Sequence, residues 1–416
     1  MKEKLCAILG LVLVFGMTSC ANVPKINSDS TGTANGELES SIDSNVFSTY
    51  SAENHSLEVS DTSTSINTEL QQVDWSKIEV LDEMDLDYEA DDYYYGVWCD
   101  LTEYEKSCYI FAGYVTDEIE DAIDNGIKIT NVFSDDKCLS FPDKIGEKSI
   151  VSVDPIVYYN ANSVKLPSNV LYINGRGNDH RYGFGVPAPN GNIEQIVLPD
   201  GLISIGSSSF NYYPNLKEID IPNSVLRIGR NAFFRCENLV HLKLSNNLVT
   251  IEEDAFSNCK SLENIIIPDS VELMEEGVFS GCVALEEVVL PKGISRIEDA
   301  MFWGCSSLKK VVFYPNSVSK IGAGAFYKCT SLTEIVIPEG VTTLESHQAV
   351  RNDDLDWMGA FTNCSNLKNV DIPDSVTYIG DKTFSGCSED LTVNYKGKTY
   401  NSKNIQKLYD RDLSNL

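Results

Sequence analysis

The feature that most constrains this chain is a unit of 23 residues that repeats through its second half. Between Phe210 and Phe384, phenylalanines stand at intervals of 23, 23, 23, 23, 24, 35 and 23 residues. From Phe233 onward each is followed three residues later by a cysteine, and most of these cysteines are followed three residues later by a leucine. A unit this short cannot bury its own apolar face, so a run of units predicts stacked coils around one continuous core.

Each unit also contains a short stretch of alternating side chains, as in Ile265–Ile267, which usually ends at a proline. Alternation sends every second side chain inward, which is typical of a β-strand. From Leu139 to Val393 the pattern predicts about eleven coils, or roughly 50 Å of stacked strands. We expect an inward ladder of repeated side chains: Phe233, Phe256, Phe279, Cys236, Cys259, Cys282, Cys305, Cys329, Cys364 and Cys387.

The units share the pattern C-x-x-L-x-x-V-x-I-P-x-x-V-x-x-I-x-x-x-A-F, as in CTSLTEIVIPEGVTTL (329–344) and CSNLKNVDIPDSVTYIGDKTF (364–384). This pattern resembles the BspA-like leucine-rich repeat family of bacterial surface proteins, closely over residues 193–393 and more loosely over 137–192. The resemblance implies a repeat solenoid: a right-handed leucine-rich-repeat coil with a parallel β-sheet on one face and short helical or turn segments on the other.

Composition divides the chain further. A basic start, a short apolar stretch and a small-residue end predict a signal peptide. Its last residues, Met17-Thr18-Ser19-Cys20, resemble the lipobox of bacterial lipoproteins, which implies lipidation at Cys20; ordinary cleavage after Ala21, releasing the protein, is the alternative. We predict the following regions: 1–19 signal peptide, 20–72 flexible Ser/Thr-rich tether, 73–136 acidic aromatic N-terminal cap region, 137–393 leucine-rich repeat solenoid and 394–416 C-terminal cap.

The net charge of −30 argues against nucleic acid as a partner and against docking on an anionic membrane. Half of this excess lies in residues 74–124, which contain 17 acidic residues and two lysines. Their alternating carboxylates lack the glycine and glutamate that a calcium loop requires, so we interpret them as a solvated surface. A short helix is expected over residues 116–126. Cys99 and Cys108 could form a disulfide or remain free.

Two insertions interrupt the repeat. The interval between Pro167 and Pro199 is nine residues too long, and the coil that contains Leu344 is twelve residues too long. The second insertion carries Arg351 and Trp357, and insertions in repeat arrays often reach a binding face.

The chain shows no arrangement that predicts an enzyme. The four histidines, His55, His180, His241 and His347, lie in different coils or in the tether, and no nucleophile–base motif is present. One cysteine per coil forms a line, whereas zinc needs ligands that converge on a point. We therefore expect buried, inert thiols, no metal, no cofactor and no catalytic residue.

Binding is better supported, because the middle of the predicted sheet carries four apolar residues that point outward: Ile266, Val289, Val312 and Val336. Exposed apolar stripes often mark partner surfaces, although a two-sided strand favours valine and isoleucine in any case. The polar ligand-binding candidates beside them are His241, Lys243, Glu287, Lys310 and Glu334.

These features predict a lipid-anchored protein at the bacterial cell surface that recognises an extracellular protein, of a host or of a neighbouring bacterium. The resemblance implies adhesion. Contact with the membrane would be through the N-terminal lipid only, no nucleic acid is expected, and the protein would be a monomer. The alternatives are glycan capture by Trp357 with Tyr182 and Phe184, and a purely structural role in the envelope.

Overall fold

The computed structural model describes residues 79–81, 95–100, 122, 125–133, 138–141, 143–145, 147–153, 161–173, 192–314, 317–351 and 354–409. The chain divides into two units, Met1–Asn67 and Thr68–Leu416, and everything described belongs to the second. The predicted signal peptide, Cys20, the tether, Cys108, Tyr182 and Phe184 lie outside the described residues, as does most of the acidic cap region. Within the described part, no helix has the length and apolar character needed to cross a membrane.

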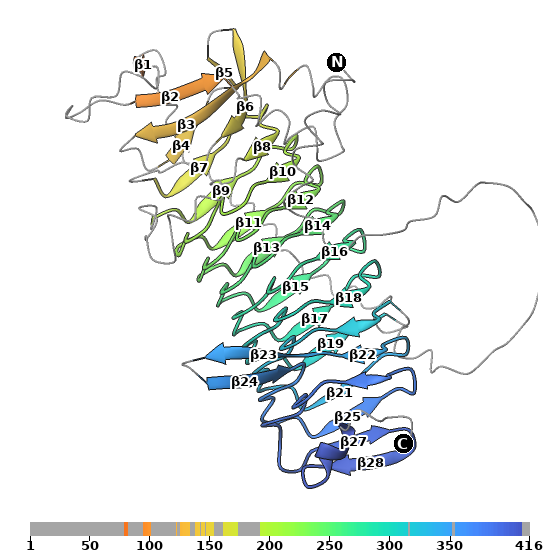
Figure 1. The fold of residues 1–416 in the computed structure, drawn as a ribbon. Coiled ribbons are helices and arrows are strands. Elements are labelled where there is room, and N and C mark those ends of the chain that lie inside the picture. Colours follow the sequence, from red (N-terminus) through yellow and green to blue (C-terminus); the bar gives the residue numbers. More distant parts are fainter. Residues whose placement is uncertain are drawn as a thin grey trace, which may run out of the picture. The chain divides into compact units, whose positions relative to one another are not determined.

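One wall of the solenoid is a row of eleven parallel strands, one from each coil, which we call the first sheet (Figure 1). The strands are β4 (Cys138–Ser140), β7 (Ser163–Lys165), β9 (Gln195–Val197), β11 (Glu218–Asp220), β13 (His241–Lys243), β15 (Asn264–Ile266), β17 (Glu287–Val289), β19 (Lys310–Val312), β21 (Glu334–Val336), β25 (Asn369–Ile372) and β27 (Thr392–Tyr395). The predicted repeat solenoid and its parallel sheet are therefore confirmed.

Regular strand pairing in the first sheet is interrupted twice, after β13 and after β19. Both places coincide with a departure from the repeat. After β13, Ser245 stands where other coils have proline, and after β19, Tyr314 is an additional residue before Pro315. The coils continue to stack across both interruptions because the apolar core is continuous.

A second sheet of parallel strands, each of only two residues, forms the opposite side of each coil, and its regular pairing is interrupted once, after Met274. These strands are β8 (Tyr172–Ile173), β10 (Ser204–Ile205), β12 (Arg227–Ile228), β14 (Thr250–Ile251), β16 (Leu273–Met274), β18 (Arg296–Ile297), β20 (Lys320–Ile321), β22 (Thr343–Leu344) and β26 (Tyr378–Ile379). The sequence predicts only turns or helical fragments here, because two residues are too few to display alternation.

The N-terminal strands extend this second sheet. β6 (Lys148–Val153) pairs with β8, and β3 (Ile127–Phe133) pairs with β6. β2 (Tyr95–Asp100) then runs antiparallel to β3, and β1 (Glu79–Leu81) runs parallel to β2, while β5 (Lys144–Ile145) pairs with β6. Ala122 and Asn125 are helical, within the predicted short helix.

Each coil returns from the second sheet to the first through a turn that carries the repeated phenylalanine. Around Phe256, Asp254 and Asn258 have φ angles of 55° and 62°, in the left-handed region. Their N–H groups and that of Phe256 all donate to carbonyls of the next coil, those of Glu276, Val278 and Ser280, at 2.6 to 3.0 Å. The full pattern recurs from the coil of Phe210 to that of Phe302, and we call it the turn ladder. In the coils of Phe326 and Phe361 it continues at the phenylalanine and at the residue two positions after it.

The core follows the predicted ladder of side chains. Eight phenylalanine rings, from Phe210 to Phe384, stack with centroids 5.1 to 5.9 Å apart. All seven ladder cysteines are free, and all except the half-buried Cys387 are buried. Each thiol donates a hydrogen bond to the phenylalanine carbonyl of the preceding coil, as Cys259 does to Phe233 at 3.3 Å. The cysteine therefore joins neighbouring coils in addition to filling space.

The second insertion leaves the coil directly after a strand of the second sheet, since it follows Leu344, the last residue of β22. Residues 174–191, which contain the first insertion, lie outside the described residues. The second insertion forms an antiparallel hairpin of β23 (Ser346–Arg351) and β24 (Asp354–Gly359), which projects from the stack (Figure 1).

The C-terminal end of the stack is covered by an antiparallel strand and a short helix. β28 (Lys398–Asn401) pairs with β27, and the 3-10 helix η2 (Ile405–Leu408) follows. Next to η2, the buried hydroxyl of Tyr409 accepts the N–H of Phe384 at 3.1 Å. This N–H belongs to the last row of the turn ladder, where no further coil can supply a carbonyl.

Candidate binding face

The strands of the first sheet place two residues outward and one inward. In β15, Asn264 and Ile266 are exposed while Ile265 between them is buried. The same alternation holds in β11, β17 and β21. The hydrogen-bonded register aligns equivalent residues of successive coils, so each outward position forms a file along the stack.

The four predicted outward residues lie in one file, which we call the apolar stripe. Ile266 is 83% exposed and Val336 is 65% exposed, whereas Val289 and Val312 are half-buried between them. Ile266 is in register with Val289, and Val289 with Val312, so the three side chains are neighbours on the sheet. Val336 belongs to the next strand, β21, beyond the interruption in pairing.

Charged residues stand at both ends of the apolar stripe, in the same file. Lys243, in register with Asp220, precedes it, and Asp371, in register with Val336, follows it. All three charged side chains are exposed. The stripe is therefore a bounded apolar patch within a polar sheet.

Four of the polar candidates, His241, Glu287, Lys310 and Glu334, form the neighbouring file of the same face, whereas Lys243 stands in the file of the stripe. His241 and Glu334 are exposed, and Glu287 forms an ion pair with Lys310 of the next coil at 2.8 Å. Exposed ion pairs of this kind contribute about 0–1 kcal/mol each, so this pair is available to reorganise on binding. The structure thus brings the predicted polar residues and the apolar stripe onto one face.

The same file carries one more exposed valine, which lies outside the stripe. Val197 of β9 is in register with Lys165 of β7 and is 42% exposed, and the charged Asp220 and Lys243 separate it from Ile266. Two further valines, Val240 and Val283, are 39% and 40% exposed. The repeat pattern around Val197 is weaker than in later coils, but its alternation with Ile196 is the signal that places it.

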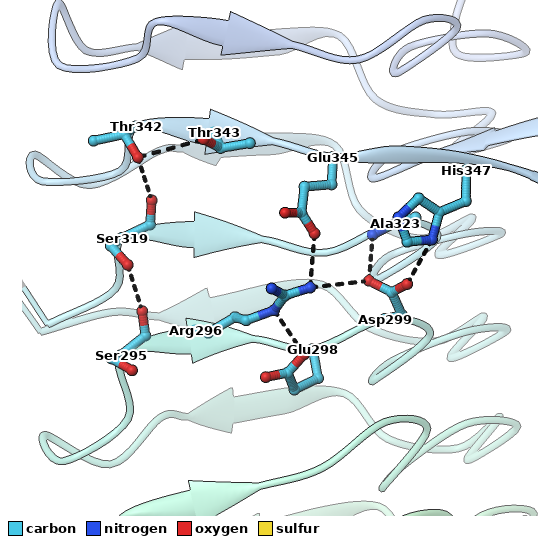
Figure 2. A network of polar contacts seen from close by, with 10 residues as sticks. All are labelled: Ser295, Arg296, Glu298, Asp299, Ser319, Ala323, Thr342, Thr343, Glu345 and His347. Carbon is cyan, nitrogen blue, oxygen red and sulfur yellow. Dashed lines mark hydrogen bonds and ion pairs between the residues drawn. The ribbon is translucent and has the colours of Figure 1, made fainter. Parts of the chain in front are cut away.

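The hairpin with Arg351 and Trp357 is attached on a different side of the coil. Arg351 is in register with Asp354, and Trp357 with Gln348. At the base of the hairpin, His347 Nδ1 lies 2.9 Å from Asp299, and Arg296 lies 2.7 Å from Glu345 (Figure 2). These contacts are to the second-sheet side, so they do not join the two candidates to the apolar stripe.

The network at this hairpin base spans three coils. Arg296 also contacts Glu298 at 2.6 Å and Asp299 at 3.5 Å, and Asp299 accepts the N–H of Ala323 at 2.9 Å (Figure 2). The guanidinium of Arg296 therefore forms ion pairs with three carboxylates that would otherwise repel one another. This arrangement fixes the position where the hairpin leaves the stack.

The thiols of the ladder are poor nucleophiles. Burial raises the pKa of Cys236 and Cys282 to about 12, and raises that of Cys259 well above its ordinary value. Only the thiolate is reactive, so at neutral pH these side chains remain protonated donors. No group of three or more His, Cys, Asp or Glu among the described residues is arranged to hold a metal.

Comparisons with known proteins agree with this geometry. The family model described as "BspA type Leucine rich repeat region" matches in six copies, over residues 189–309, 227–353 and 358–407. A search of curated proteins finds no match.

Three solved structures are similar to the chain. A leucine-rich repeat protein of T. pallidum is 25% identical, covering 52% of this chain and 86% of its own, with a TM-score of 0.38. A leucine-rich cell surface protein of Faecalibacterium prausnitzii is 21% identical, covering 70% and 94%, with a TM-score of 0.33. A leucine-rich repeat protein of Eubacterium ventriosum is 17% identical, covering 67% and 95%, with a TM-score of 0.39.

Proposed function

Because this chain belongs to the BspA-type leucine-rich repeat family, we propose that it is an exported protein that binds an extracellular protein through its first sheet. In this proposal a lipid at Cys20 holds the protein at the bacterial cell surface, and the ligand is a protein of a host or of a neighbouring cell. Adhesion is the consequence of such binding. The protein acts as a binding module rather than as an enzyme.

The apolar stripe is the observation that carries this proposal. Ile266 and Val336 expose most of their surface to water, although a solvent-facing position on a strand could equally hold threonine or a charged residue. Burying such side chains against a partner is favourable by about 1.5–3 kcal/mol for each residue. The polar file beside the stripe, with His241, Glu287 and Glu334, supplies hydrogen-bonding groups that give specificity.

Binding of the wild-type chain and of two matched double variants tests the proposal. The partners offered are purified extracellular-matrix proteins, intact host cells and intact bacteria. The stripe variant is Ile266→Glu with Val336→Glu, and the control is Leu273→Glu with Tyr378→Glu, which are exposed at 44% and 43% on the second sheet. We expect the stripe variant to weaken binding at least about tenfold and the control to bind like wild type.

Two results would contradict the proposal. If the folded wild-type chain binds none of the partners, it is not a protein-binding surface module. If both variants bind as tightly as wild type, the ligand uses another surface. Thermal unfolding of each variant checks that the fold is intact, which we expect because all four substituted side chains are exposed.

A further inference from the structure

The outward charges of the first sheet change sign across its centre. The boundary between β17 and β19, which we call the midline, divides the apolar stripe into two equal halves (Figure 1). In the file of the stripe, Lys243 stands on the third strand before the midline and Asp371 on the third strand after it. In the polar file, Glu287 and Lys310 stand directly on either side of the midline, in register with each other.

The residue that precedes each of these two strands repeats the change of sign. Glu286 and Lys309 are exposed, stand on opposite sides of the midline and form an ion pair at 2.8 Å. Glu287 and Lys310 form a second pair beside it, also at 2.8 Å. Ion pairs in water are weak, so these four side chains can exchange their partners at little cost.

The coils stay aligned over this region, although regular strand pairing is interrupted twice. Ahead of β15, the N–H of Ser261 donates to the carbonyl of Glu237 at 3.1 Å, and ahead of β21, the N–H of Ser331 donates to that of Ser306 at 3.0 Å. The six strands β13, β15, β17, β19, β21 and β25 therefore present their outward residues as continuous files.

This arrangement makes the face complementary to itself. A second copy, turned by 180° about an axis that runs along the strands over the midline, faces the first copy with its stack in the opposite direction. Each residue before the midline then meets the residue the same number of strands after it. The opposed residues are Lys243 with Asp371, Glu287 with Lys310, Glu286 with Lys309, Ile266 with Val336, and Val289 with Val312. Each contact occurs twice, because a two-fold contact uses the same patch on both copies.

Like charges are not opposed anywhere else in these three files over the six strands. The remaining opposed residues are His241 with Asn369, Asn264 with Glu334, Val240 with Lys368, and Glu263 with Thr333. At the rim, past the prolines, Asp269 comes nearest to Glu339 of the other copy, but Asp269 already forms an ion pair with Lys292 at 2.5 Å. A parallel pair would instead place Lys243 against Lys243 and Asp371 against Asp371, so the charges select the antiparallel arrangement.

We propose, in place of the monomer expected from the sequence, that the ligand of the apolar stripe is a second copy of this chain, bound face to face and antiparallel through the first sheet. This rests on the binding function proposed above and names its partner: the same protein on a neighbouring cell. Among the partners offered there, bacteria that display this chain should therefore bind. In an antiparallel pair the first coils of the two copies lie at opposite ends, so N-terminal anchors point in opposite directions, as a contact between facing cells requires.

The contact is small, so two single copies are expected to bind each other weakly. Six strands at about 4.8 Å and four residues at about 3.3 Å give a patch of roughly 380 Å² on each copy. Stable complexes bury about 800 Å² on each partner, so a dilute solution should contain mostly monomers. Many copies on two facing surfaces bind with much greater avidity, which suits adhesion between cells.

Clustering of beads that carry the full-length chain tests the proposal. The chain is attached by its N-terminus to red and green beads, and two-colour clusters are counted by flow cytometry. At about 150 mM salt the Debye length is about 8 Å, so the negative charge remote from the contact is screened. We expect wild-type beads to cluster at least about tenfold more than beads that carry the stripe variant Ile266→Glu with Val336→Glu.

Two charge variants test the pairing itself. Glu286→Lys with Glu287→Lys makes both sides of the midline basic, and Lys309→Glu with Lys310→Glu makes both sides acidic. We expect beads of either variant alone to lose clustering at least about tenfold, because like charges are then opposed. When one variant is on the red beads and the other on the green beads, every lysine again meets a glutamate, so clustering between colours should recover.

The control variants carry the same net charges at exposed positions outside the contact. They are Glu272→Lys with Glu389→Lys, and Lys320→Glu with Lys403→Glu. Beads of each control should cluster like wild type, alone and when mixed. Circular dichroism and thermal unfolding confirm that each variant is folded.

Zero-length carbodiimide cross-linking identifies the orientation of the two copies. Within one copy, Lys243 and Asp371 are five strands apart, or about 24 Å, so a direct amide bond between them can form only between copies. We expect this cross-link in wild-type clusters and its loss in the stripe variant.

Four results would overturn the proposal. Wild-type beads that do not cluster, while the wild-type chain binds a foreign protein through the stripe, would leave the binding function intact and assign the stripe to that protein. If neither copies nor foreign proteins bind, both proposals fail. Clusters without the cross-link between Lys243 and Asp371 would show a different contact. Charge variants that do not recover clustering when mixed would show that their side chains are not opposed.

Discussion

At the residue scale, the repeated cysteine has two roles that the sequence does not separate. It fills space beside phenylalanine and leucine, as the ladder predicts, and its thiol also donates to a carbonyl of the preceding coil. That carbonyl accepts a second hydrogen bond, because in the coil of Phe233 it also receives the N–H of Cys236 at 3.1 Å. The thiol therefore has a hydrogen-bond acceptor at a position where burying a donor without one would cost free energy.

Substitutions at Cys259 distinguish these two roles. If cysteine only filled space, Cys259→Ser would bury an unpaired hydroxyl and be less stable than Cys259→Ala. Because the Phe233 carbonyl lies 3.3 Å from the thiol, we expect the reverse order, with Ser more stable than Ala by about 1 kcal/mol. Urea unfolding measures the difference, and a lower unfolding midpoint for the serine variant would refute the donor role.

A second prediction concerns the left-handed residues of the turn ladder. Ala300 has a φ of 55°, whereas its counterparts in the neighbouring coils, Gly277 and Gly324, carry no Cβ. A left-handed conformation costs a non-glycine residue about 1–2 kcal/mol. We therefore expect Ala300→Gly to raise the free energy of unfolding by about 1 kcal/mol, since the gain exceeds the entropic cost of glycine in the unfolded chain.

The buried Ala255 is a control for this substitution. It lies in the turn ladder but has no positive φ, so Ala255→Gly should destabilise the protein. Equal effects of the two substitutions in chemical denaturation would show that strain at Ala300 is not the cause.

At the scale of the element, the first sheet and the apolar stripe were accessible from sequence, whereas the second sheet and the turn ladder were not. The three-residue strands display alternation, so Ile265 is correctly predicted to be inward and Ile266 outward. The second-sheet strands are two residues long, and the turn ladder depends on backbone angles. Its left-handed positions carry Asn, Asp or Gly in many coils, as at Asn231, Asp254 and Gly277, and this signal could have revealed them.

The C-terminal cap is an element whose contribution can be measured. Tyr409→Phe leaves the N–H of Phe384 buried without an acceptor, and we expect a loss of about 1–3 kcal/mol. Tyr400, in β28, is also buried, but its hydroxyl has no hydrogen-bond partner among the described residues. Tyr400→Phe should therefore be neutral or slightly stabilising. A similar loss in both variants, measured by urea unfolding, would argue against the capping role of Tyr409.

At the scale of the whole molecule, stability depends on the excess of carboxylates over cations. Burial, followed by the neighbouring Glu253, raises the pKa of Asp254 to about 6, and burial also raises the pKa values of Glu276 and Glu298. A carboxyl group whose pKa is higher in the folded state takes up a proton on folding when the pH lies between its two pKa values. The folded state is then favoured as the pH falls from about 7 toward 4.

This linkage predicts that the melting temperature rises as the pH is lowered from 7.5 to 5. Asp254→Asn removes the buried charge and places asparagine where the preceding coil has Asn231, which has the same φ of 55°. We expect the variant to melt at a higher temperature than wild type at pH 7.5 and to show a smaller increase toward pH 5. Asp220→Asn, at an exposed position of β11, is the control for loss of one charge. Identical pH profiles for wild type and Asp254→Asn would contradict the prediction.

The corner where the hairpin leaves the coil has a consequence for how this protein can vary. Extra residues leave the coil after Leu344, and the strands on both sides of this insertion, β22 and β26, still pair in register. The corner is therefore a place where the chain can gain a new loop while its neighbours keep their partners. The equivalent position after Ile251 is a suitable site for grafting a foreign peptide, so that the scaffold can acquire new specificities by insertion instead of by remodelling its sheets.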